Sequence, residues 1–323
     1  MDLSAGWVIF YLLVFPGFLF TSVVGLVYVW VDRKVTARVQ FRVGPPLLQP
    51  FYDFFKLLGK DTFVPEGAPR SIFLGAPLMG LASVSLLSSI LLVSNLFPGQ
   101  AFGGDIIVVL YLFAFVPIIL IMGASASSNP ISALGGSREM TLYLGYELPL
   151  LFALATIILK SGGAFRIGDL LEWQWANRPF LYHLSGAFAF VAAFLCIQAK
   201  MGFIPFDAAE AEQEIMGGII IEHSGPVLGV LKLTKAMLYF VVSIFLTILF
   251  WGGFRMPTGR QWWHVFGWLK PIAILVLIVL MKNTNPRLRV DQALRFFWSI
   301  VLVISVIGFI LAAVSRTAGI GWM

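Results

Sequence analysis

The chain has 323 residues, of which 59% are hydrophobic and only 12% are charged. A soluble domain carries about 25% charged residues, so this composition argues against a soluble protein and indicates a membrane protein. The single cysteine, Cys196, excludes a disulfide within the chain and an iron–sulfur cluster that this chain ligates with cysteines alone. The net charge of +6 comes from cations between apolar segments, so it does not indicate nucleic-acid binding.

Eight apolar segments match the roughly 20 residues that cross a bilayer as a helix. In chain order they cover about Trp7–Val31, Ile72–Leu96, Ile106–Ala126, Met140–Lys160, Leu181–Ala199, Val227–Trp251, Val265–Met281 and Phe296–Ala313. The sequence therefore predicts an all-α polytopic membrane protein with about eight transmembrane helices, in a single membrane domain of residues 1–323. An even number of spans places both termini on one side of the membrane.

The loops between these segments differ in their content of lysine and arginine. The side that receives Arg33, Arg138 and Arg287 collects more of these cations than the other side. Because cytoplasmic loops carry the excess of Lys and Arg, we assign this side to the cytoplasm and both termini to the outside. The cytoplasmic loops are then residues 32–70, 127–139 and 200–226, and the predicted location is the cytoplasmic (inner) cell membrane.

The first cytoplasmic loop, residues 32–70, contains a helix breaker followed by an amphipathic segment. The tripeptide GPP at residues 44–46 interrupts any helix. The segment LLQPFYDFFKLLGKD follows it, with Phe and Leu gathered on one face. A segment of this kind is typical of a helix that lies in the plane of the membrane interface.

Two of the predicted spans contain ionisable side chains. Glu147 lies about eight residues into the fourth span, which is about 12 Å deep at 1.5 Å per residue. Lys235 lies at a similar depth in the sixth span, and Lys232 is three residues nearer the surface. Charges at such depth are costly and indicate function, although a structural protonated Glu147 and a snorkelling Lys232 are alternatives. Because an unpaired buried charge is unfavourable, we expect Glu147 and Lys235 to approach each other, directly or through a water, as a buried switch.

The third cytoplasmic loop contains the stretch IPFDAAEAEQEIMGGIIIEHSG, which gathers five carboxylates, Asp207, Glu210, Glu212, Glu214 and Glu222. On a helix, Asp207, Glu210 and Glu214 would share one face, whereas Glu212 would point elsewhere. One interpretation of this spacing is an exposed acidic surface helix. The apolar residues around the acids favour a second interpretation, in which the loop is tucked against other parts of the protein.

Three motifs in this chain resemble those of one known family. IPFDAAEAEQE followed by IEHSG is similar to the most specific signature of the H-type membrane subunit of respiratory complex I. GSREMTLYLGYELP, residues 136–149, resembles the Ser-Arg-Glu…Tyr-Glu motif of the same family. DRKVTARVQFRVGPPLLQPFYDFFKLLGKD is similar to its first cytoplasmic loop. The motifs occur in the family's order, so the resemblance covers the whole chain.

Within this family the chain is most similar to the membrane subunit of energy-converting, membrane-bound [NiFe] hydrogenases and related ferredoxin-linked complexes. Its GPPLLQP element is shorter than the Gly-Pro-Asn element of quinone-reducing relatives. Lys200 and Lys235 also stand where those relatives are expected to have glutamates. A quinone-binding H-type subunit of complex I remains the alternative.

The resemblance implies a coupling subunit without a catalytic centre of its own. A peripheral module would pass electrons through Fe–S clusters, and in a hydrogenase-type complex to a [NiFe] centre, at the cytoplasmic face of this chain. A charge or conformational change would then pass through carboxylates into neighbours that move H⁺ or Na⁺. No cofactor is expected on this chain itself. The implied partners are hydrogenase-like large and small subunits, ferredoxin-like Fe–S subunits, antiporter-like membrane subunits and the lipid bilayer.

Two groups of side chains are candidates for these roles. The residues expected on the proton route or in the coupling are Glu139, Glu147, Asp207, Glu210, Glu212, Glu214, Glu222, Lys232 and Lys235. The residues expected in a cytoplasmic docking surface are Arg33, Arg38, Arg42, Gln49, Asp53, Lys56 and Arg138. One docking surface is expected because all motif-bearing loops fall on the cytoplasmic side.

Two function classes outside this family stay open from the residues alone. A secondary transporter would show internal repeats with broken helices in matching halves, and no clear repeat relates residues 1–160 to residues 161–323. A plain membrane anchor for a peripheral enzyme would explain the cytoplasmic loops. It would not explain Glu147 and Lys235 inside the spans.

Overall fold

The computed structural model describes residues 5–101, 103–255 and 267–319. All regular structure in these ranges is helical, which confirms the predicted fold class. The elements are α1 (Ala5–Leu13), α2 (Phe18–Val39), α3 (Gln49–Leu58), α4 (Arg70–Leu96), η1 (Pro98–Gln100), α5 (Asp105–Ala126), α6 (Pro130–Lys160), α7 (Ile167–Asn177), η2 (Phe180–Tyr182), α8 (Leu184–Lys200), α9 (Glu212–Ile215), η3 (Gly218–Ile220), α10 (Gly225–Trp251), α12 (Leu269–Thr284), α13 (Val290–Phe296), η5 (Phe297–Val301) and α14 (Leu302–Ala318).

Six helical segments of the described residues are long and apolar enough to cross a membrane. They are Ile9–Val39, Arg70–Leu96, Asp105–Ala126, Pro130–Lys160, Gly225–Trp251 and Val290–Ala318. The other two expected spans correspond to α8 and α12, which have 17 and 16 residues and are about 25 Å long. The count of eight spans therefore stays a prediction.

The predicted position of both termini outside the membrane also stays a prediction, since residues 1–4 and 320–323 lie beyond the described ranges. The first two residues of the expected span Val265–Met281 lie beyond them as well.

Helix α10 forms the centre of the bundle. Within its membrane-crossing window 94% of the residues are buried, and it contacts α2, α3, α4, α8 and α12. Gly25 permits a close crossing between α2 and α10, because a Cβ at this position would lie 2.6 Å from the carbonyl oxygen of Ala236. Because α10 is enclosed by other helices, it is apolar around most of its circumference.

Helix α6 begins earlier than predicted. Asn129 caps it by accepting a hydrogen bond from the backbone N–H of Ile131, and proline suits the first helical position that follows. The predicted loop 127–139 is therefore mostly helix. As a result, Arg138 and Glu139 are held on a rigid element rather than on a flexible loop.

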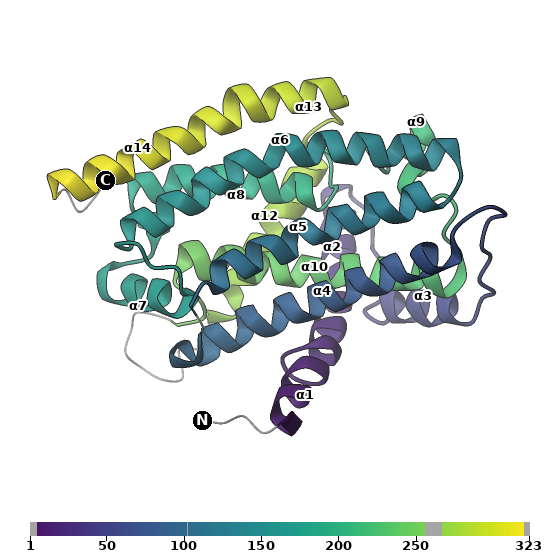
Figure 1. Ribbon diagram of the computed structural model, residues 1–323, viewed down its shortest axis with the longest axis horizontal. Coiled ribbons are helices and arrows are strands. Elements are labelled where there is room, and N and C mark those ends of the chain that lie inside the picture. Colours follow the sequence, from purple (N-terminus) through teal and green to yellow (C-terminus); the bar gives the residue numbers. More distant parts are fainter. Residues whose placement is uncertain (1–4, 102, 256–266, 320–323) are drawn as a thin grey trace.

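The motif-bearing segments gather at one end of the bundle. Figure 1 shows α3 and α9 at the right-hand end, whereas α7 and the end of α14 lie at the opposite end. Contacts of α3 with α2 and α10, and of η3 with α5 and α6, tie these segments to the bundle. The structure thus places the motif-bearing segments at one end of the bundle, and their cytoplasmic location stays a prediction.

Candidate functional site

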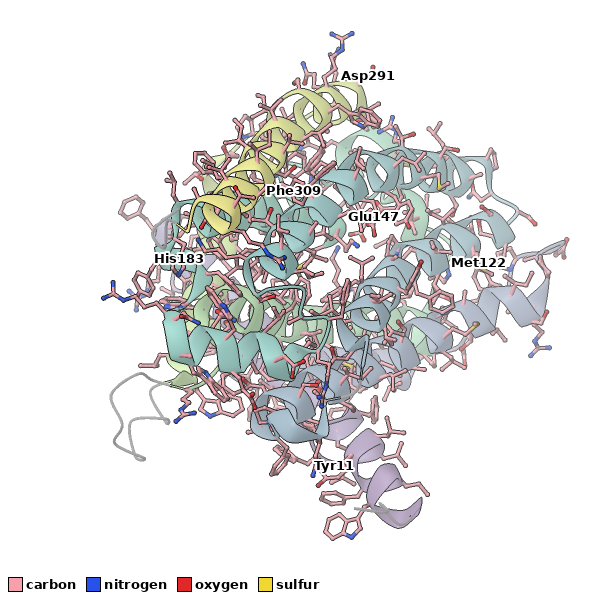
Figure 2. The ribbon with its side chains drawn as sticks, turned by 60° about the vertical axis from the view of Figure 1, so that its left-hand side comes forward. Tyr11, Met122, Glu147, His183, Asp291 and Phe309 are labelled. Carbon is pink, nitrogen blue, oxygen red and sulfur yellow. The ribbon has the colours of Figure 1, made fainter. Side chains whose placement is uncertain are left out.

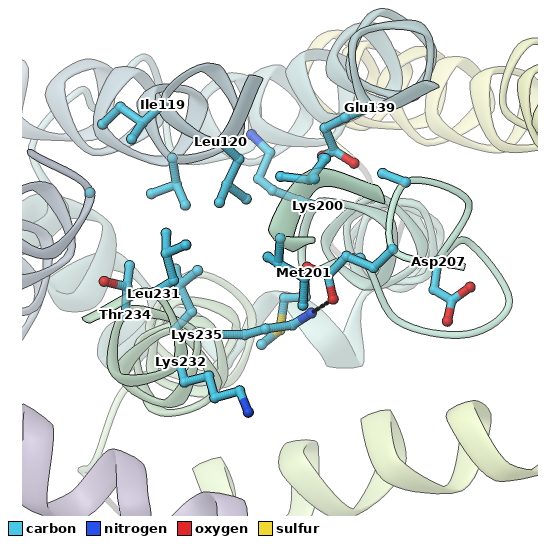
Figure 3. A pocket seen from close by; sticks show the side chains of 18 of the residues that line it. Ile119, Leu120, Glu139, Lys200, Met201, Asp207, Leu231, Lys232, Thr234 and Lys235 are labelled. Carbon is cyan, nitrogen blue, oxygen red and sulfur yellow. Dashed lines mark hydrogen bonds and ion pairs between the residues drawn. The ribbon is translucent and has the colours of Figure 1, made fainter. Parts of the chain in front are cut away.

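A cavity of about 80 Å³ lies at this end of the bundle, among α5, α6, α8, α10 and the chain between α8 and α10. Its wall is mostly apolar, but charged side chains also line it: Glu139, Lys200, Asp207, Glu210, Lys232 and Lys235. Figure 3 shows Glu139 and Lys200 on one side of the cavity and Lys232 and Lys235 on the other. A water molecule needs roughly 10–15 Å³ of such space, whereas a cavity of about 150 Å³ holds benzene. The cavity therefore suits water, protons and small ions rather than an aromatic ring.

Lys235 forms an ion pair with Glu210 at the cavity wall. The Nζ atom of Lys235 lies 2.6 Å from Oε2 of Glu210, and this contact is drawn as a dashed line in Figure 3. Both side chains are about three-quarters buried. The pair therefore connects the central helix α10 to residues 204–225, which we call the acidic segment.

Glu147 forms an ion pair with Lys200, 2.9 Å long, rather than with Lys235. Figure 2 shows Glu147 toward the inside of the bundle. The predicted direct pair of Glu147 and Lys235 is therefore wrong, because each has another partner. Its motivation was equal depth, but depth does not fix the direction in which a helix presents a side chain. Helix α8 packs against both α6 and α10, and its Lys200 meets the Glu147 carboxylate.

Glu139 is 5% exposed and lines the cavity from α6. In the part of the chain that the structure describes, its carboxyl group has no protein hydrogen-bond or ion-pair partner. A buried carboxyl group normally has a hydrogen-bond partner, and cavity water is the available one. Glu139 is therefore the group in this cavity that is best placed to exchange a proton with internal water.

The predicted acidic helix does not form. Helix α9 has only four residues, and Asp207 and Glu210 lie before it in irregular structure that follows Pro205. Three of the acids instead pair with cations from different helices and loops. Glu210 reaches Lys235 of α10, and Glu214 lies 2.5 Å from Arg138 of α6. The second interpretation, a segment tucked against other parts of the protein, is therefore the one that the structure supports.

Asp207 links the acidic segment to the segment after α12. Its Oδ2 atom lies 2.9 Å from Nη2 of Arg287, and its Oδ1 atom is buried without a hydrogen-bond partner among the described residues. Burial raises the pKa of Asp207 above its ordinary value, and the Arg287 charge opposes this shift only in part. Protonation of Asp207 therefore requires less acid than protonation of an ordinary aspartate.

The remaining predicted route residues lie at the margin of the cavity or away from it. Lys232 lines the cavity but is largely exposed. Glu222 accepts a hydrogen bond from the amide of Asn129, which caps α6. Glu212 and Glu214 are exposed on α9. A role of Glu212, Glu214 and Glu222 in the coupling stays a prediction.

The residues of segment 32–70 that are predicted to dock a partner fall into two sets. Arg33 and Gln49 both donate to the Asp53 carboxylate, at 2.7 Å and 2.9 Å, and the bond from Arg33 joins α2 to α3. Partial burial acts to raise the pKa of Asp53, but these two hydrogen bonds hold it below its ordinary value. The other set, Arg38, Arg42 and Lys56, is exposed. The first set orders the loop, and the second is free to meet a partner.

Lys200 is the site residue that sequence reasoning missed. It appeared there only as a departure from the glutamate of quinone-type relatives. The signal that could have found it is its position in the last turn of an apolar helix, where it is 7% exposed. A lysine buried to this extent requires hydrogen-bond acceptors, and the Glu147 carboxylate supplies one.

Comparison with known proteins decides the family. The family model described as NADH dehydrogenase matches residues 11–313. The chain belongs to this NADH dehydrogenase family. It is 32% identical over 317 residues to the H-type subunit of the NADH-quinone oxidoreductase of Thermomicrobium roseum, covering 90% of this chain and 91% of that relative. It is 29% identical to the H-type subunit of the F(420)H(2) dehydrogenase of Methanosarcina mazei, covering 88% of this chain and 86% of that one.

A solved structure of the same fold comes from an archaeal respiratory membrane complex, the membrane-bound sulfane sulfur reductase. The similarity has a TM-score of 0.82 at 26% identity and covers 95% of this chain and 99% of the matched chain. The predicted resemblance to the H-type membrane subunit is confirmed. This family member is a multi-pass membrane subunit of a multisubunit respiratory complex.

Proposed function

We propose that this chain couples electron transfer in a docked peripheral module to the movement of H⁺ or Na⁺ across the cytoplasmic membrane. The observation that carries this proposal is the charged cavity. Two lysine–carboxylate pairs meet there, and Glu139 faces the same space without a protein partner among the described residues. A membrane anchor needs no such arrangement, and groups of this kind inside a membrane are costly to maintain.

The cavity couples charge to proton uptake by electrostatics. Two unit charges 4 Å apart interact by about 4 kcal/mol at an effective dielectric constant of 20. A change in the charge of Glu210 therefore alters the field at Lys235 and at the neighbouring Glu139. Glu139 then takes up or releases a proton through cavity water. The Lys200–Glu147 pair, which begins at the same cavity, passes the change along α6 into the membrane interior.

The redox centres belong to partner subunits in this proposal. The chain has one cysteine, Cys196, which is fully buried in α8, and one thiolate cannot hold an Fe–S cluster. Fe–S subunits, and a hydrogenase-like pair with [NiFe] if the complex is of that type, would dock on the exposed cations of the first cytoplasmic loop. Antiporter-like subunits would lie beside the bundle in the membrane.

Ion transfer is favoured over quinone binding at this cavity. The cavity is about half the volume that holds benzene. Three lysines also form part of its wall, and two of them, Lys200 and Lys235, have carboxylate partners. If the complex nevertheless reduces quinone, quinone-site inhibitors will block its electron transfer, and this outcome would replace the ion-route assignment.

The coupling role is tested in liposomes that contain the intact purified complex. Addition of a reduced low-potential electron donor is expected to drive uptake of H⁺ or Na⁺, followed with a pH dye or with ²²Na⁺. Lys235→Met is expected to lower ion uptake per electron while the complex stays assembled. Lys160→Met, which removes a lysine at the other end of α6, serves as the matched control. Equal ion uptake in both variants would contradict the proposal.

The docking role is tested with introduced cysteines, for which this chain is well suited because Cys196 is buried. Cysteines at Arg42 or Lys56 are expected to crosslink to peripheral subunits. A cysteine at Glu172, exposed on α7 at the opposite end, should crosslink to none of them. Crosslinks from position 172 alone would place the module at the opposite end of the bundle and contradict the docking role.

A further inference from the structure

A second buried charge cluster lies outside the cavity, where α2, α10 and α12 meet. Asp32 of α2 is 5% exposed. Lys282 of α12 donates to both of its carboxylate oxygens, at 2.9 Å and 3.2 Å. The hydroxyl of Tyr239 on α10 donates to the Oδ2 atom at 3.0 Å. Three segments far apart in the chain thus meet at one carboxylate.

Phe203 connects this cluster to the cavity. Its ring centroid lies 5.3 Å from the ammonium of Lys282 and 5.5 Å from the ammonium of Lys235. The ring also packs against that of Tyr239, with the centroids 4.6 Å apart. An ammonium within about 6 Å of a ring face is attracted by the ring electrons. One aromatic side chain therefore contacts a lysine from each of the two ion pairs.

A structural clamp between three helices is the simpler account of this cluster. A buried ion pair is weak evidence for stability, however, because apolar residues of similar size often stabilise such a site as well or better. The two ammonium groups also contact one ring, and the charged carboxylates offset the repulsion between them. The charge of Asp32 therefore changes the electrostatic potential at Lys235, and the charge of Glu210 changes the potential at Lys282.

We propose that Asp32, Tyr239 and Lys282 form a second charge site of the ion route, coupled across Phe203 to the Lys235–Glu210 pair. The species that this second site binds is a proton. A change in the charge of either carboxylate alters the electrostatic potential around Phe203 and therefore acts on the other ion pair. The two carboxylates therefore act as one unit that extends the route from the cavity to α2. This inference rests on the proposed coupling function.

The test is a double-mutant cycle on the reconstituted complex, with ion uptake per electron as the measurement. Asp32→Asn and Glu210→Gln are each expected to lower this ratio. Because the two carboxylates act as one unit, the double variant should be no worse than the more severe single variant, a departure from multiplicative behaviour of about tenfold. A ratio for the double variant equal to the product of the single effects would overturn the proposal.

A second set of variants tests whether Phe203 transmits the coupling. In a Phe203→Leu background the same cycle is expected to become multiplicative, and Phe203→Tyr, which keeps the ring, should restore the coupling. A structural clamp predicts no such rescue. If Asp32→Asn prevents assembly, Tyr239→Phe takes its place, since it removes only the hydroxyl that donates to Asp32. Wild-type coupling in Tyr239→Phe would then overturn the proposal.

Two controls separate this inference from the proposed function. Asp169→Asn removes a half-exposed carboxylate that pairs with Arg166 on α7, and it should leave ion uptake unchanged. A wild-type complex that moves no ions would contradict the coupling function as a whole. A wild-type complex that moves ions, together with an Asp32→Asn variant that moves them equally well, would contradict this inference alone.

Discussion

The ammonium of Lys200 lies 2.9 Å from the carboxylate of Glu147, and only 4% and 17% of these side chains are exposed. Lys200 also lies 5.4 Å from the ring centroid of Tyr146, the residue before Glu147. Because Lys200 lines the cavity as well, this pair connects a carboxylate deep in α6 to the charged cavity. The lysine that departs from the quinone-type pattern thus holds one end of the proposed route.

Removal of one partner of this pair should lower the stability of the protein more than removal of both partners. Lys200→Met leaves a buried carboxylate without its cation, which costs about 3–5 kcal/mol of stability in comparable buried pairs. Combining it with Glu147→Gln removes the stranded charge and should recover much of that loss. Thermal unfolding of the purified complex in detergent, followed by tryptophan fluorescence, measures the difference. Single and double variants of equal stability would mean that Glu147 is not charged in the wild-type protein.

Glu139→Gln should leave the complex assembled and lower ion uptake per electron at least several-fold. The amide keeps the size of the side chain but cannot exchange the proton that we assign to this position. Glu172→Gln, the same substitution at an exposed site on α7, is the matched control. Uptake measured in liposomes with the two variants side by side decides the matter, and wild-type uptake in Glu139→Gln would remove Glu139 from the route.

Acid should destabilise the protein through His223. Its ring stacks on that of Phe73, with the centroids 4.6 Å apart, and burial lowers the pKa of this histidine below its ordinary 6.5. Because the folded protein favours the neutral ring, this contribution to stability is complete above pH 6.5 and is lost as the pH falls through the lowered pKa. Melting temperatures measured from pH 7.5 to pH 5 should therefore fall less for His223→Phe, which keeps the stacked ring, than for the wild-type chain. Parallel curves would refute this assignment.

Lys270→Met should lower stability without affecting coupling in the protein that remains folded. The ammonium of Lys270 is buried and donates to the backbone carbonyl oxygens of Trp251, Gly253 and Arg255, each at 2.9 Å, and so closes the end of α10. Loss of a donor that leaves buried acceptors unsatisfied costs about 1–3 kcal/mol. Measured on the same preparation, the variant should unfold at a lower temperature but keep wild-type ion uptake per electron. A coupling defect in fully assembled complex would show that this end of the bundle takes part in the route.

The sequence by itself determined the membrane class and predicted that the motifs share one side of the membrane. Hydropathy and charge are local properties, so residues 227–251 could be assigned to a span without knowledge of their neighbours. The cost of a charge in a membrane likewise singled out Glu147 and Lys235, whatever their partners are. The three motifs predicted the family, which the comparison confirmed.

Only the tertiary structure decided which charges meet. A partner depends on how each helix is rotated about its axis and on which helix packs beside it, and spacing along the chain contains neither. Lys200 therefore takes Glu147, and Lys235 takes Glu210 from a segment that spacing alone would have made a helix. Asp32 and Lys282 are 250 residues apart, and only the packing of α2 on α12 brings them together.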